Sequence, residues 1–262
     1  MRMKGTIMET IVQAKRVLEI FKEMSQIPRE SGNEKGISDY IVNFAKHLGL
    51  EVHQDEIFNV VIKKAASPGY ENRPSIILQG HIDMVCVKDH DSNHDFSKDP
   101  IANIIGEWMH ADHTTLGADN GMGAAMMLAL LEDESQQHGP MQLLFTTNEE
   151  TGMDGAFAIK EGQVTGDYLL NLDTEVEHDF TVSCAGGCHV HVKIPLLREN
   201  NLPGYDAGLS ITVTGLKGGH SGIEINEQRA NANQVLTRVL YDIQQQYPIS
   251  LASFEGGVKH NA

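Results

Sequence analysis

Three short apolar runs, each followed by a side chain that can bind metal or transfer protons, constrain the fold of this chain most. The runs are residues 75–80, 141–147 and 167–172, and they precede His81, Glu149 and Asp173, respectively. Their length and composition predict buried strands. Residues 121–132 are rich in Ala, Met and Leu and predict a helix between the first two runs. Strands that alternate with helices predict an α/β sheet, in which ligands bind beyond the carboxyl ends of the strands.

The amino-terminal part of the chain adds further elements to this sheet. Apolar spacing predicts helices over residues 8–25 and 34–48, with Pro28 ending the first and Gly49 the second. Residues 51–64 alternate in polarity as strands do.

The pattern of apolar and polar residues changes after Asp173. Residues 189–194 and 209–214 alternate with period two, which predicts strands of a half-exposed sheet. A helix is predicted over residues 226–246 and another strand over 249–254. We therefore predict two domains, with residues 1–183 in the first and residues 184–262 in a smaller α+β domain.

The composition excludes several classes of partner. The chain has 20 basic and 36 acidic residues without a basic cluster, which argues against binding to nucleic acid or to a membrane surface. No apolar run approaches the roughly 20 residues that a membrane-spanning helix needs. The three cysteines are an odd number in a long chain, and the first residues do not resemble a signal peptide. We expect a cytoplasmic protein.

His81 and Asp83 are two residues apart at the end of a predicted strand, so their side chains leave on the same side. Asp83 can then accept a hydrogen bond from the imidazole and orient His81 as a metal ligand. Such a pair alone is equally well explained as a structural contact. Asp119 lies between Gly117 and Gly121, where little bulk obstructs a metal, and its carboxylate could bridge two cations. The alternative for Asp119 is an ordinary helix cap.

Glu149 and Glu150 are adjacent at a strand end, so one could bind metal while the other takes a proton from water. The alternative is a solvated charge pair. Asp173 ends a run predicted to be buried, where an unpaired carboxylate would be costly and a metal would remove that cost. One imidazole and three carboxylates form a ligand set suited to zinc, with manganese or cobalt as substitutes.

His220 lies in a glycine-rich segment, residues 217–222, beyond the predicted domain boundary. Its imidazole could donate a hydrogen bond to a developing oxyanion. The alternative is a structural loop histidine.

The motifs at residues 80–85, 117–121 and 148–152 together resemble those of the zinc dipeptidases of the aminoacylase and carboxypeptidase G superfamily. Within it, the chain is most similar to the aminoacyl-histidine dipeptidases, also called Xaa-His dipeptidases or peptidase D, over residues 12–262. The resemblance implies an α/β fold with a mixed sheet flanked by helices, as in zinc exopeptidases. The resemblance also implies that part of a smaller α+β lid domain comes next in the chain. The protein would form a homodimer through this lid domain.

The resemblance also implies a role for each candidate residue. One metal would be held by His81, Asp119 and Asp173, and a second by Asp119, Glu150 and a further histidine. Glu149 would be the general base, and Asp83 would orient His81. The peptide bond between Asp119 and Asn120 would be cis. His220 of the lid would polarise the substrate carbonyl, and Asn261 would help to hold the substrate.

The implied activity is hydrolysis of dipeptides, with carboxyl-terminal histidine as in carnosine. Relatives continue beyond the position of Ala262, and the resemblance assigns the second-metal histidine to that continuation. One alternative is therefore a non-catalytic or incomplete fragment that binds one metal or needs a carboxyl-terminal piece. Another is an N-acyl amino acid deacylase of the same superfamily.

Overall fold

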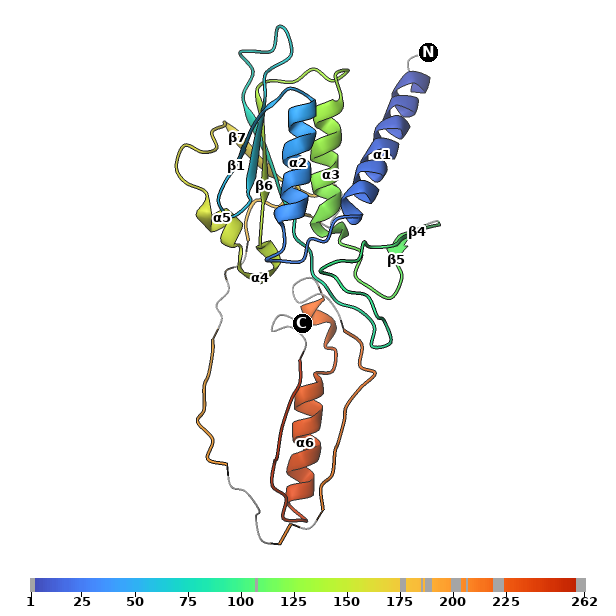
Figure 1. The fold of residues 1–262 in the computed structure, drawn as a ribbon, viewed down its shortest axis with the longest axis vertical. Coiled ribbons are helices and arrows are strands. Elements are labelled where there is room, and N and C mark those ends of the chain that lie inside the picture. Colours follow the sequence, from blue (N-terminus) through green and yellow to red (C-terminus); the bar gives the residue numbers. More distant parts are fainter. Residues whose placement is uncertain are drawn as a thin grey trace. The chain divides into compact units, whose positions relative to one another are not determined.

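A computed structural model of the chain describes residues 3–106, 108–174, 178–184, 186, 190–198, 204–205, 207–218 and 224–257. The side chains of residues 3–13 and of Ile225 are outside this description. The chain divides into two compact units, Met1–Cys184 and Ala185–Ala262 (Figure 1).

The first unit contains the predicted helices. Its helices are α1 (Met3–Ser25), α2 (Lys35–His47), α3 (Ala118–Glu132), α4 (Glu149–Gly152) and α5 (Asp154–Ala158). In α2, Ile37, Ile41 and Ala45 are spaced four residues apart and are buried, as the apolar spacing predicts. The helices predicted over residues 8–25, 34–48 and 121–132 are confirmed.

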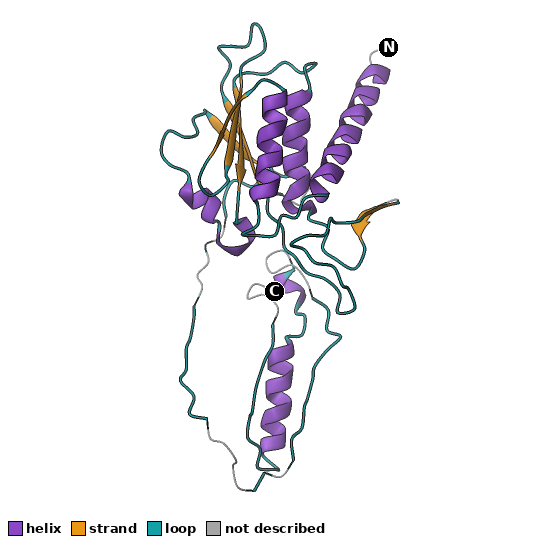
Figure 2. Ribbon diagram, viewed as in Figure 1, coloured by secondary structure: helices purple, strands orange, loops and turns teal. Residues whose placement is uncertain are grey.

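A five-stranded mixed sheet forms the centre of this unit (Figure 2). Its strands are β1 (Glu51–Gln54), β2 (Val60–Lys64), β3 (Ile76–His81), β6 (Met141–Thr146) and β7 (Tyr168–Asn171), in the order β1-β2-β6-β3-β7. The β1–β2 and β2–β6 pairs are antiparallel, whereas β3 runs parallel to both β6 and β7. The α/β fold with a mixed sheet flanked by helices is therefore confirmed. A separate hairpin joins β4 (Asn103–Ile105) and β5 (Met109–Ala111).

The two faces of the sheet have separate apolar layers. Alternate strand residues on one face pack with α1, α2 and α3; they are Val60, Ile62, Leu78, Leu143 and Phe145. The other face presents Val61, Ile77 and Leu144, which pack against Ile159 and Val164. The central strands are thus buried on both faces, as their continuous apolar sequences predict.

Strand β7 was predicted to be buried, and this part of the prediction is wrong. Tyr168 and Leu169 are 61% and 56% exposed. Strand β7 pairs with β3 and is the last strand of the sheet. Its apolar composition suits burial, but its edge position leaves it exposed to solvent. The existence of the strand itself is confirmed.

The described part of the second unit is helical or irregular. It contains a short 3₁₀ helix, η1 (Ile225–Glu227), and α6 (Ala232–Gln244). The side chain of Asn231 caps α6 by accepting a hydrogen bond from the backbone N–H of Gln234 at 3.1 Å. The predicted strands are not formed in the described residues 190–194, 209–214 and 249–254. Alternation alone does not supply the partner strand that a sheet requires, and Val190 and Val192 are mostly exposed.

Within the described residues, no helix combines the length and the apolar composition needed to cross a bilayer.

Candidate metal centre

The candidate ligands converge at one edge of the sheet. His81 is the last residue of β3 and lies in register with Thr146, the last residue of the parallel strand β6. The carboxyl ends of parallel strands meet at the same edge, so residues that follow β3, β6 and β7 lie close together. Asp83 follows β3, and Asp173 follows β7. The sequence prediction that these strand ends share one site therefore has a direct basis in the sheet order.

Glu149 and Glu150 lie slightly differently from the sequence prediction. Strand β6 ends at Thr146, and the two glutamates form the first turn of the short helix α4. Their side chains are partly buried. Asn148, directly before them, has a left-handed backbone conformation with φ 53°, which turns the chain from the strand into the helix.

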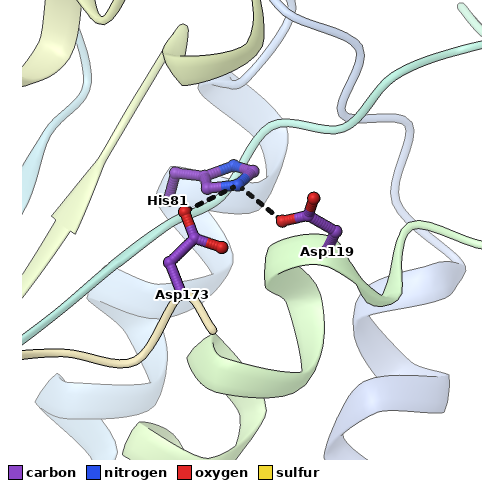
Figure 3. A group of neighbouring side chains, drawn as sticks. All are labelled: His81, Asp119 and Asp173. Atoms are coloured by element: carbon purple, nitrogen blue, oxygen red, sulfur yellow. Dashed lines mark hydrogen bonds and ion pairs between the residues drawn. The ribbon is translucent and has the colours of Figure 1, made fainter. Parts of the chain in front are cut away.

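The Nε2 atom of His81 faces a group of carboxylates. It lies 3.0 Å from Oδ1 of Asp119 and 3.7 Å from Oδ2 of Asp173 (Figure 3). It also lies 4.0 Å from Oε2 of Glu149. Among the described residues, two groups have potential ligand atoms that all lie within 4.8 Å of one another, namely His81 with Asp119 and Asp173, and His81 with Glu149 and Glu150.

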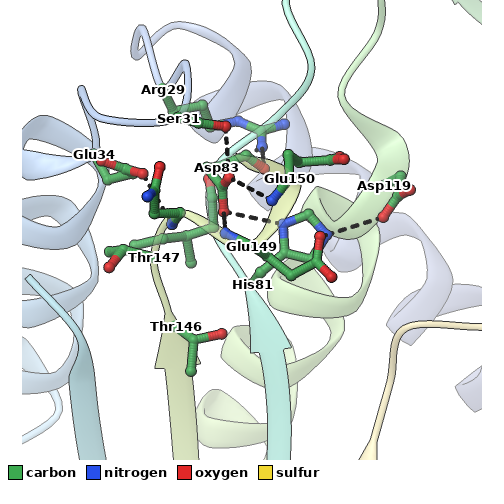
Figure 4. A network of polar contacts seen from close by, with 12 residues as sticks. Arg29, Ser31, Glu34, His81, Asp83, Asp119, Thr146, Thr147, Glu149 and Glu150 are labelled. Carbon is green, nitrogen blue, oxygen red and sulfur yellow. Dashed lines mark hydrogen bonds and ion pairs between the residues drawn. The ribbon is translucent and has the colours of Figure 1, made fainter. Parts of the chain in front are cut away.

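The other ring nitrogen of His81 faces Asp83. Nδ1 lies 3.3 Å from Oδ1 of Asp83, and both side chains are buried (Figure 4). Asp83 also accepts hydrogen bonds from the Ser31 hydroxyl at 2.7 Å and from the backbone N–H groups of Glu149 and Glu150 at 3.1 and 3.2 Å. Burial opposes ionisation of Asp83, but the contacts with His81 and Ser31 lower its pKa overall. An ionised Asp83 favours a proton on Nδ1, so that Nε2 is the nitrogen left to bind a cation once it loses its own proton.

The carboxylates crowd one another, and their pKa values reflect this. Burial and the charge of Asp119 raise the pKa of Glu150 to about 7, and the same two causes raise that of Asp173 to about 6 against the attraction of His81. Burial opposes a charged His81, yet Asp119 and Asp83 raise its pKa to about 10. The site thus retains protons because it concentrates negative charge. A divalent cation with nitrogen and oxygen ligands fits these groups, because it would replace those protons.

Asp119 lies at a break in the backbone at the start of α3. Its φ and ψ of −82° and 116° are not helical, and Gly117, with φ 74°, is the residue that caps the helix. The Asp119–Asn120 peptide bond is cis, which confirms the geometry that the family resemblance implies. Asp119 is therefore placed beside His81 instead of serving as an ordinary helix cap.

Several supporting residues were missed from the sequence. Asn59 is buried, accepts a hydrogen bond from the Thr147 backbone N–H at 3.0 Å and donates to the Gly155 carbonyl at 2.9 Å. Glu34 accepts from the Asn148 backbone N–H at 3.0 Å. Both contacts hold the link between β6 and α4. The sequence places Glu34 only at the start of a predicted helix, and an isolated asparagine such as Asn59 carries no signal of its own.

The predicted residues His220 and Asn261 lie outside the described residues. The other predicted site residues lie together in the structure; they are His81, Asp83, Asp119, Glu149, Glu150 and Asp173 (Figures 3 and 4).

Comparison with known proteins places this chain in a family. Residues 77–251 match the model of peptidase family M20/M25/M40. The chain belongs to this family. The matched region begins within β3 and includes all the acidic residues of the candidate centre.

Similar proteins include peptidases from several bacteria. A cytosol non-specific dipeptidase of Escherichia coli is 44% identical over 93% of this chain and 50% of its own length. The crystal structure of an aminoacylhistidine dipeptidase from Vibrio alginolyticus is similar with a TM-score of 0.61 and 38% identity, over 88% of this chain and 47% of that one. A tripeptidase structure from Staphylococcus aureus gives a TM-score of 0.53 and 27% identity, over 62% of this chain and 44% of that one. The chain spans about half the length of these relatives.

Proposed function

We propose that this chain carries the principal metal-binding and catalytic groups of a dipeptidase that hydrolyses its substrate at a two-metal site. The observation that carries the proposal is the position of His81, whose Nε2 faces Asp119, Asp173 and Glu149 while Oδ1 of Asp83 lies 3.3 Å from Nδ1 on the other side of the ring. Membership of a peptidase family supports the same chemistry. In this proposal, residues 1–183 form the amino-terminal part of the catalytic domain, and residues 184–262 belong to a lid domain through which the protein dimerises.

The proposed ligands of the first metal are His81, Asp119 and Asp173. Asp119 and Glu150 would contribute to the second, together with a histidine that the family resemblance requires. We favour zinc, because the donor set combines one imidazole with carboxylates. When bound, the metals would polarise the scissile carbonyl and lower the pKa of the attacking water.

Glu149 is the proposed general base. It would take a proton from the attacking water and return it to the leaving amine. Burial raises the pKa of Glu149, which increases its affinity for the transferred proton. His220 is proposed to donate to the developing oxyanion, and both His220 and Asn261 to contact the substrate.

The proposed substrates are dipeptides, including those with carboxyl-terminal histidine such as carnosine, and we propose a cytoplasmic location. The support comes from the names of two relatives, a cytosol non-specific dipeptidase and an aminoacylhistidine dipeptidase. The experiment is a panel of dipeptides and N-acyl amino acids incubated with the metal-loaded chain, with product release measured by amine detection. Release of both amino acids from dipeptides, abolished by a chelator and restored by zinc, is expected. Hydrolysis confined to acyl amino acids would instead identify a deacylase.

A second candidate is a chain that binds one metal and needs a further piece for catalysis. One observation favours this candidate. Among the described residues, the two potential ligand groups share His81, and neither contains a second histidine. Metal stoichiometry measured beside the dipeptide assay separates the two candidates. Two metals with turnover support the enzyme, and one metal without turnover supports the incomplete chain.

A further inference from the structure

Arg29 is a charged residue buried beside the candidate metal centre (Figure 4). It is 2% exposed, and it lies in the segment between α1 and α2. Burial lowers its pKa to about 10, while the carboxylates of Asp83 and Asp119 oppose that shift, so the guanidinium stays charged at neutral pH. Among the described residues, no carboxylate lies within ion-pair distance of it. A buried charge without a paired carboxylate is expensive and calls for an explanation.

The guanidinium joins two segments that carry candidate ligands. Nη1 donates to the carbonyls of Ile82 and Asp83 at 3.2 and 3.3 Å, and Nη2 donates to the carbonyl of Gly117 at 2.6 Å. The first two carbonyls directly follow His81, and the third lies two residues before Asp119. The backbone reinforces this link, since the carbonyl of Arg29 accepts from the N–H of Met84 at 3.1 Å.

The glycines that flank Asp119 make room for this side chain. A Cβ atom on Gly117 would lie 2.5 Å from Nη2 of Arg29, and one on Gly121 would lie 2.7 Å from the same atom. Real Cβ atoms essentially never approach so closely. The sequence interpretation, that these glycines leave space for a metal, is therefore replaced at these two positions by close approach of a buried arginine.

We propose that Arg29 is a positioning residue of the metal centre, which sets the separation of His81 and Asp119 by binding the backbone beside each of them. The inference rests on the proposed function, because it assumes that these two side chains bind metal. A planar guanidinium suits the task, since it presents several N–H donors in a fixed arrangement, whereas a lysine ammonium cannot hold the same carbonyls in the same geometry.

The test compares the full chain with Arg29→Met, Arg29→Lys and a matched control, Arg16→Met. Arg16 also links distant elements, with Nε 2.6 Å from Glu132, but it contacts none of the candidate ligands. Each protein is stripped of metal and titrated with Zn²⁺ against a chromophoric chelator. The visible spectrum of the Co²⁺ form and the melting temperature of the metal-free form are also recorded.

Both Arg29 variants should bind Zn²⁺ about 10- to 100-fold more weakly, the usual effect of removing a group that supports a metal ligand. Their Co²⁺ spectra at saturation should differ from that of the wild type, because the ligand geometry has changed. Arg16→Met should melt at a lower temperature and keep both the Zn²⁺ affinity and the Co²⁺ spectrum. Arg29 variants that melt early but bind Zn²⁺ as the wild type does would overturn the inference.

Gly121→Ala provides an independent variant should Arg29→Met fail to fold. It keeps Arg29, but the added Cβ would lie 2.7 Å from Nη2 of Arg29 and 2.9 Å from Cε2 of Phe21, so both side chains must shift. The same loss of Zn²⁺ affinity is expected, and unchanged affinity and Co²⁺ spectrum would count against the inference. A wild-type chain that binds no metal would remove the proposed function and this inference together. A wild-type chain that binds metal, with Arg29 variants equal to it, would remove only this inference.

Discussion

The carboxylate of Asp83 lies 3.3 Å from Nδ1 of His81, on the side of the ring opposite Asp119. Asp83 is itself held by the Ser31 hydroxyl and by two backbone N–H groups at the start of α4. This one buried carboxylate therefore links the orientation of the imidazole to the position of Glu149 and Glu150. Changes at Asp83 should affect metal binding even though its carboxylate lies against Nδ1 and not against Nε2, the nitrogen that faces the other carboxylates.

Asp83→Asn should weaken Zn²⁺ binding by about 10- to 100-fold, because a neutral amide no longer favours the His81 tautomer with its proton on Nδ1. Competition with a chelator measures the change. Asp39→Asn is a suitable control, since Asp39 is a surface residue paired with Lys35. Equal Zn²⁺ affinities in the Asp83→Asn and Asp39→Asn proteins would refute the orienting role.

Glu149→Gln should reduce dipeptide hydrolysis by about 10²- to 10⁴-fold, the range typical for loss of a general base. Its metal content should remain that of the wild type, because the proposed metal ligands are other side chains. Turnover and metal content are measured on the same preparation. Full activity in this variant would remove Glu149 from its proposed role.

Glu150 should make the metal-free chain less stable as pH rises. Its pKa is raised from 4.5 to about 7, so the folded chain binds this proton more tightly than the unfolded chain does. The resulting stabilisation is complete below pH 4.5 and is lost as pH rises through 7. Glu150→Gln lacks this titration and should therefore gain stability relative to the wild type across that interval.

Thermal unfolding of both proteins at several pH values with a chelator present tests this prediction. Saturating zinc should reverse the trend, because zinc binds the deprotonated carboxylate and stabilises the wild type increasingly as pH rises. A stability difference that stays constant between pH 4.5 and 7 in the chelator would contradict the assignment.

Asn59→Ala should lower the free energy of unfolding by about 3 kcal/mol, since it leaves the buried Thr147 N–H and Gly155 carbonyl without these partners. Urea denaturation measures the loss. Asn93→Ala, at an exposed loop position, should change the same quantity by less than about 0.5 kcal/mol. Similar values for the two variants would show that Asn59 does not hold the β6–α4 link.

The parts of the fold that were predictable from sequence are those determined by local pattern. The spacing of Ile37 and Ile41 is enough to indicate a buried helix face, and the run before His81 is enough to indicate a buried strand. The exposure of Leu169 was not predictable in the same way, because it depends on where β7 lies in the sheet. Strand predictions around Val192 and Ile211 were wrong for the same physical reason, since strand formation requires a partner.

The residues of the candidate site also divide into those that local sequence pattern reveals and those that depend on the fold. His81, Asp119 and Asp173 were identifiable because each has ligand chemistry next to a predicted strand end or helix start. Arg29 was not, because its contact with Gly117 joins residues 88 positions apart, and glycine spacing does not reveal which atom needs the room.

The central claim is that the His81–Asp119–Asp173 cluster binds a divalent metal. The most direct test is equilibrium dialysis of the chelator-stripped chain against Zn²⁺, with bound metal measured in the wild type and in Asp119→Ala. The wild type should retain at least one zinc per chain, and Asp119→Ala should lose most of it, because this carboxylate is proposed to serve both metals. A wild-type chain that retains no zinc, or an Asp119→Ala chain that retains as much as the wild type, would contradict the claim.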